Sequence, residues 1–155
     1  MSGKQLKIEI ISGEVNSGKT TRLIQKINEL NKQNYRIGGF ISHSIYMGNT
    51  KSGYMVQDLS ENNFYHLIHN QQSEIFTIKQ GRFFFNENLF KELNLRIKLL
   101  LDYDYLVIDE IGPLELNNKG FYDGLIYLLN NYKNNLILIT RNKLLMDVKN
   151  RFVKF

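Results

Sequence analysis

Residues 13–20 read Gly-Glu-Val-Asn-Ser-Gly-Lys-Thr and fit the pattern G-x-x-x-x-G-K-[ST]. In such a loop, consecutive backbone N–H groups surround a phosphate, and glycines at both ends allow the required dihedral angles and close approach. The apolar, β-branched run 6–11 precedes the loop, and apolar residues recur at helical spacing from Gly18 to about Lys32. A strand, a loop and a helix in this order predict a P-loop, whose helix presents its positive N-terminal end to a polyphosphate.

The side chains at the end of this loop indicate which phosphate compound it binds. Lys19 is expected to reach the β- and γ-phosphates of a nucleoside triphosphate, which makes it a candidate catalytic residue. The Thr20 hydroxyl is expected to ligate Mg²⁺. The expected nucleotide-binding residues are Gly13, Glu14, Val15, Asn16, Ser17, Gly18, Lys19, Thr20 and Thr21.

A second group of candidate residues follows the apolar strand 105–108, which ends in Asp109 and Glu110. In a P-loop protein such a strand end supplies the acid that organises Mg²⁺, so Asp109 is the expected metal residue beside Thr20. Glu110, one residue on, is expected to orient or deprotonate the attacking water. Arg141 follows another apolar strand, 136–140, where a cation could sense a γ-phosphate. An ordinary surface arginine is the alternative there.

The remaining pattern predicts the fold. The segments 106–108 and 136–139 are apolar at consecutive positions, which is typical of parallel strands covered on both faces. A further strand is expected at 36–42, and helices at 86–101, capped by Asn86, at 120–131 and at 143–150. Residues 43–85 are β-rich and interrupted by polar turns. We therefore expect one domain over 1–155, with a three-layer α/β P-loop fold, a mostly parallel central sheet and an inserted β-hairpin or meander.

Two strings together resemble a known family. Gly18-Lys19-Thr20-Thr21 and Asp-Glu-Ile-Gly-Pro-Leu-Glu-Leu at 109–116 are similar to those of the cancer-related, or thermophilic-type, nucleoside-triphosphatases. The resemblance runs from about residue 6 to the C-terminus. It implies a P-loop fold, hydrolysis of a triphosphate to a diphosphate and phosphate with broad base preference, Mg²⁺ organisation by Asp109 and water activation by Glu110. Glu115 matches the second glutamate of the motif, for which we expect a supporting role. The chain departs from the family at 44–46, where Ser-Ile-Tyr stands in place of a Glu-Val-Arg-like string.

The amino-acid composition limits the class of protein and its cellular location. Hydrophobic residues make up 43% of the chain and charged residues 23%, an ordinary globular balance. Apolar runs are far shorter than the roughly 20 residues that span a bilayer, and the first residues contain no apolar signal-peptide core. The chain has no cysteine, which excludes disulfides and thiolate metal sites. We expect a soluble, cytoplasmic protein without a membrane partner.

The net charge of +5 permits a nucleic-acid partner, but the basic residues are spread along the chain and do not indicate one. No pattern identifies a protein partner.

These observations favour Mg²⁺-dependent hydrolysis of nucleoside triphosphates such as ATP and GTP. One alternative is a kinase that acts on a nucleotide or another small molecule, because residues 43–85 could hold an acceptor. No arginine-rich lid of the kind that excludes water from a kinase site is visible. The other alternative is a nucleotide-gated regulatory module that binds without appreciable turnover.

Overall fold

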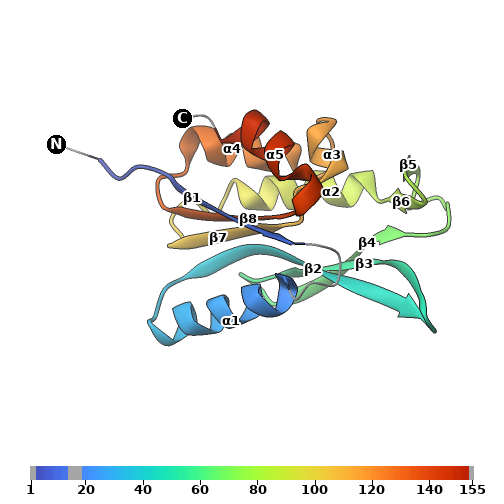
Figure 1. Ribbon diagram of the computed structural model, residues 1–155, viewed down its shortest axis with the longest axis horizontal. Coiled ribbons are helices and arrows are strands. Elements are labelled where there is room, and N and C mark those ends of the chain that lie inside the picture. The colour runs from blue at the N-terminus through green and yellow to red at the C-terminus, as the bar shows by residue number, and fades with distance from the viewer. Residues whose placement is uncertain (1–2, 14–18, 154–155) are drawn as a thin grey trace.

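The structure is a computed structural model that describes residues 3–13 and 19–153, with the backbone alone for Lys19 (Figure 1). Its strands are β1 (Lys7–Gly13), β2 (Ile37–Met47), β3 (Thr50–Asp58), β4 (Asn63–His69), β5 (Ile78–Gln80), β6 (Phe83–Phe85), β7 (Tyr105–Asp109) and β8 (Asn135–Arg141). Its α-helices are α1 (Lys19–Lys32), α2 (Glu87–Ile97), α3 (Pro113–Leu116), α4 (Tyr122–Asn131) and α5 (Leu145–Phe152), and the 3₁₀ turn η1 (Asn142–Leu144) leads into α5.

The described strands form one eight-stranded sheet in the order β1-β8-β7-β2-β3-β4-β6-β5. The first four strands are mutually parallel, and every pairing from β2 to β5 is antiparallel. The expected α/β class is confirmed, and the segment 43–85 is an antiparallel meander, as predicted. Because this meander extends the same sheet, the parallel arrangement is confined to the half that contains β1, β8, β7 and β2.

Helices cover both faces of the parallel half, which gives the expected three layers. Figure 1 shows α1 on one face and α2, α4 and α5 on the other. Leu23 and Ile27 of α1 pack in one cluster with Val107, whereas the neighbouring Ile108 belongs to the cluster on the opposite face. Consecutive apolar residues in a strand are therefore buried on alternate faces, as the sequence indicated.

The close approach of β2 and β7 depends on a glycine. Gly39 has a φ of +101°, and a Cβ at this position would overlap the backbone of Val107 on the neighbouring strand. Only glycine adopts this conformation without strain and leaves that space. The contact holds the end of β2 beside the end of β7, where the acidic residues lie.

Several helix and strand bounds differ from those expected. The Asn86 side chain caps α2 by accepting a hydrogen bond from the backbone N–H of Leu89, as predicted, but the helix ends at Ile97 and not near Leu101. The strand β2 continues past Ser42 to Met47, because β3 pairs with this extension. The short helix α3 was not expected, although Pro113 at its first position suits a helix start. Within the described residues, no helix combines the length and apolar character needed to cross a bilayer.

Candidate active site

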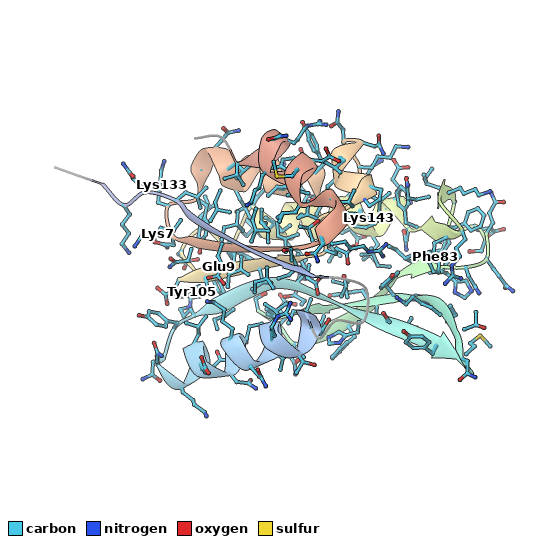
Figure 2. All side chains as sticks on the ribbon, viewed as in Figure 1. Lys7, Glu9, Phe83, Tyr105, Lys133 and Lys143 are labelled. Carbon is cyan, nitrogen blue, oxygen red and sulfur yellow. The ribbon has the colours of Figure 1, made fainter. Side chains whose placement is uncertain are left out.

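The register of the parallel strands brings the predicted site residues to one edge of the sheet. Gly13, the last residue of β1, pairs with Arg141 at the end of β8. Asp109, the last residue of β7, pairs with Ile139 on the other side of β8. The entry to the P-loop and the acidic strand end therefore flank β8 at its carboxyl end, where ligands of open α/β sheets bind. Figure 2 shows Tyr105, at the start of β7, on the opposite side of the molecule from Phe83.

Glu110 and Arg141 form an ion pair at this edge. The Arg141 Nε lies 3.0 Å from the Glu110 Oε1, and the two side chains are 29% and 26% exposed. The Arg141 Nη2 also donates to the hydroxyl oxygen of Tyr54 at 3.5 Å. The structure therefore brings together two residues that the sequence placed 31 positions apart on separate strands. Arg141 therefore contacts the candidate residue Glu110, and its role toward a γ-phosphate stays a prediction.

Asp109 is held in place by Ser42. The backbone N–H of Ser42 donates to Asp109 Oδ2 at 3.2 Å, and the Ser42 hydroxyl donates to the Asp109 carbonyl oxygen at 2.6 Å. Asp109 is only 4% exposed. These two bonds tie the carboxyl end of β7 to β2 and fix the direction of the carboxylate. Sequence reasoning gave Ser42 no role, and only the strand pairing identifies it.

Glu115 supports the loop between β7 and α4. Its Oε1 accepts from the backbone N–H of Gly112 and its Oε2 from that of Phe121, each at 2.9 Å. The side chain is fully buried, and this burial raises the pKa of Glu115 to about 7, although the two N–H donors act in the opposite direction. These two hydrogen bonds fasten the loop that follows Glu110, and the supporting role expected for Glu115 stays a prediction.

The burial of Glu115 predicts a specific dependence of stability on pH. The pKa is higher in the folded chain than its ordinary value of 4.5, so the folded chain binds more protons than the unfolded chain between these values. The free energy of unfolding should therefore fall as pH rises from about 5 to about 7, by a Glu115 contribution on the order of 3 kcal/mol. Urea unfolding of wild type and Glu115→Gln across this range measures it, with the exposed Glu92→Gln as control. An unchanged pH slope in Glu115→Gln would rule out this origin.

A cavity of about 300 Å³ opens beside Glu110. Glu110, Arg141 and Ser42 contribute polar groups to its lining, and the apolar lining includes Leu67, Phe83, Phe85, Phe90, Leu114 and Phe121. A second, more open cavity of about 510 Å³ shares Tyr54, Arg82, Phe83 and Arg141 with the first and adds Lys51. Sequence reasoning did not assign these residues of the meander to the site.

The P-loop itself lies only partly within the described residues. Glu14, Val15, Asn16, Ser17, Gly18 and the Lys19 side chain are outside them. Gly13 ends β1, and α1 begins at Lys19, so the strand and the helix on either side of the loop are as predicted. Thr20 and Thr21 occupy the first turn of α1 and are exposed. The roles of all these residues remain predictions from the motif.

Comparison with known proteins identifies the family. The model of the NTPase family matches residues 9–154, which is nearly the whole chain. The chain belongs to the NTPase family. This NTPase is 30% identical to nucleoside-triphosphatase THEP1 of Methanocaldococcus jannaschii over 134 residues, which cover 85% of the chain and 77% of that relative.

Two further similarities extend the comparison. The THEP1 nucleoside-triphosphatase of Methanopyrus kandleri is 28% identical over 114 residues, 74% of this chain but only 62% of that relative's length. The solution structure of a human cancer-related nucleoside triphosphatase superposes with a TM-score of 0.67 at 19% identity, covering 96% of this chain and 85% of that one. At this identity the structural match shows a shared fold. The family model and the relatives named above, and not the structural match, place the chain in the nucleoside-triphosphatase class.

Proposed function

We propose that this NTPase cleaves the bond between the β- and γ-phosphates of a nucleoside triphosphate in a Mg²⁺-dependent reaction with water. The observation that carries the proposal is the Glu110 carboxylate, held 3.0 Å from Arg141 at the strand edge where β1 enters the P-loop. A carboxylate that follows the metal-organising acid is suited to take a proton from an attacking water. The names of the archaeal relatives specify no base, and we propose ATP and GTP as substrates with broad acceptance of the base.

The residues present fit a Mg²⁺ ion. A carboxylate from Asp109 and a hydroxyl from Thr20 are the hard oxygen ligands that Mg²⁺ prefers. Ser42 donates its N–H to one carboxylate oxygen of Asp109, which orients the group as outer contacts of metal ligands commonly do. When bound, Mg²⁺ would draw charge from the phosphoryl oxygens of the substrate.

Besides the metal ion, Arg141 and Lys19 would provide positive charge around the phosphates of the substrate. Lys19 follows the glycine of the motif and would reach the β- and γ-phosphates. Arg141 would contribute its guanidinium group to the phosphoryl oxygens while still orienting Glu110, because it lies between the P-loop strand and the acidic strand end. The negative charge that develops during transfer would then face two cations in a partly enclosed site.

A phosphate-release assay tests the proposal. Release should occur with ATP, GTP, CTP and UTP in the presence of Mg²⁺ and should fall to the uncatalysed rate when EDTA removes the metal, because the substrate charge is then unscreened. Restoring Mg²⁺ should restore the rate, which excludes damage by the chelator. Tight triphosphate binding without phosphate release would instead indicate a nucleotide-gated binding module. Since nucleoside triphosphates and Mg²⁺ are abundant in the cytoplasm, we propose that the enzyme works there.

A further inference from the structure

The cavity beside Glu110 is much larger than the attacking water requires. A water molecule occupies about 30 Å³ in the liquid. The cavity measures about 300 Å³, and most of its lining is apolar. Ordered waters need several polar partners, whereas an apolar cavity of this size favours an organic ligand. The attacking water would therefore fill only a small part of this space.

The position of the cavity relative to the sheet indicates which ligand it takes. Its walls come mainly from the meander and α2: Tyr54 of β3, Leu67 and Ile68 of β4, Phe83 and Phe85 of β6, and Phe90. In the sheet order, β8 and β7 separate β1 from β2 and the meander. The cavity thus extends from Arg141 and Glu110 toward the meander, away from the P-loop strand. A triphosphate held by the P-loop with its γ-phosphate near Glu110 would have its base on the other side.

The lining groups suit a flat organic molecule with a hydroxyl group. Phe85, Phe90 and Phe121 are 2%, 3% and 2% exposed, and their rings meet edge to face at 5.5 Å and 5.0 Å between centroids. Gln80 adds an amide that can hydrogen-bond a polar ring edge. Toward the P-loop strand the lining includes Arg141, whose strand pairs with β1, and the Glu110 carboxylate, the group that accepts a proton in the proposed hydrolysis. Aromatic walls with a few polar groups are typical of sites for ligands of this kind.

We infer that this cavity is a phosphoryl-acceptor pocket and that the enzyme transfers the γ-phosphoryl group to the hydroxyl of a nucleoside. The inference rests on the proposed function, because the donor site and Glu110 are the same. The nucleoside hydroxyl gives its proton to Glu110, and its oxygen forms a bond to the γ-phosphorus. The bond from that phosphorus to the β,γ-bridging oxygen breaks, and its electron pair leaves with the nucleoside diphosphate. The products are a nucleoside diphosphate and a nucleoside monophosphate.

The adjoining open cavity fits the release of such a product. Lys51, Arg82 and Arg141 are among its lining residues, and no acidic residue of the described chain lines it. The Lys51 Nζ donates to the Tyr54 hydroxyl at 3.2 Å, and the Arg82 guanidinium lies 4.2 Å from the centre of the Phe83 ring. These contacts hold the cations of Lys51 and Arg82 beside Tyr54 and Phe83, which line both cavities. A newly formed phosphate monoester would meet positive charge along this route.

The transfer assay uses wild-type enzyme, Mg²⁺ and ATP labelled in the γ-phosphate, with adenosine, guanosine, cytidine or uridine at millimolar concentration. We expect labelled nucleoside monophosphate from at least one nucleoside, and a matching fall in labelled inorganic phosphate because the acceptor displaces water. Release of phosphate without any labelled monophosphate would overturn the acceptor pocket and leave hydrolysis standing. Absence of both products would instead count against the proposed hydrolysis.

Ile68→Trp tests the location of the acceptor. Ile68 lines the cavity from β4, away from Glu110, so the added ring should fill the space. We expect transfer to fall roughly tenfold more than hydrolysis, whereas Ile68→Val, which adds no bulk, should keep the wild-type ratio. Circular dichroism and thermal unfolding check the fold, and if Ile68→Trp does not fold, the wild-type assay decides alone. A higher KM for ATP in the hydrolysis reaction of Ile68→Trp would place the base of the substrate in this cavity and overturn the inference.

Discussion

Glu110→Gln should lower the rate of phosphate release by about 10²–10³-fold while leaving the affinity for the triphosphate nearly unchanged. Glutamine keeps the size of the side chain but cannot take a proton from water. The amide oxygen can still accept a hydrogen bond from Arg141, whose Nε lies 3.0 Å from Oε1 in the wild type. The loss therefore falls on the chemical step. Steady-state phosphate release and equilibrium binding of a non-hydrolysable ATP analogue measure the two quantities separately.

Two further variants serve as controls for Glu110→Gln. Glu87→Gln removes an exposed carboxylate on α2 whose ion pair, within the described residues, is with Lys91, and it should retain full activity. Lys19→Ala should weaken both binding and turnover, because its charge acts on the phosphates in the ground state and in the transition state. Turnover by Glu110→Gln equal to that of the wild type would remove Glu110 from the catalytic role.

Asp109→Asn should reduce Mg²⁺-dependent turnover by roughly 100-fold or more. The change removes the negative charge that would hold the metal but keeps an oxygen that can accept the N–H of Ser42, which lies 3.2 Å from Oδ2. The fold should therefore persist while the affinity for Mg²⁺ falls. Titration of phosphate release with Mg²⁺ measures this, and high concentrations of the metal should recover part of the activity.

A matched control lies close to the other end of the same strand. Asp102 is 70% exposed and pairs with Arg36, three residues before β7 begins. Asp102→Asn makes the same chemical change away from the strand edge that carries the site, and it should leave the Mg²⁺ titration unaltered. Equal Mg²⁺ dependence in Asp109→Asn and Asp102→Asn would show that Asp109 does not serve the metal.

The parallel half of the fold could be predicted because its determinants are local. The strands β7 and β8 are short, nearly continuous apolar runs, the strand before Gly13 is rich in apolar, β-branched residues, and α1 has apolar residues at helical spacing. Each of these local patterns predicts the element and its burial. The family could also be predicted from residues 109–116 together with the P-loop motif. In both segments a few consecutive residues bind phosphate or metal, so the function constrains their types and their spacing.

The cavity and its contacts could not be predicted, because they depend on pairing between distant segments. Ser42 contacts Asp109 because Gly39 lets β2 approach β7 closely. The sequence around Ser42 contains no pattern that predicts this contact. The pairing of Arg141 with Glu110 follows from β8 lying beside β7, which is a property of the sheet order. For Phe83 and Tyr54, the sequence leaves open whether the ring packs in the core or stacks on a ligand, and core packing is the favoured interpretation. The way the meander extends the sheet brings both residues to the lining of the cavity.

The central claim is that a triphosphate lies at the carboxyl ends of β1, β8 and β7, with Asp109 and Glu110 facing its γ-phosphate. A crystal structure with Mg²⁺ and a non-hydrolysable ATP analogue tests this most directly. The account predicts phosphates enclosed by residues 13–20, a metal ion between the Thr20 hydroxyl and Asp109, and the γ-phosphate next to Glu110 and Arg141. A nucleotide bound elsewhere, or a metal ion that neither Asp109 nor Thr20 approaches, would contradict it.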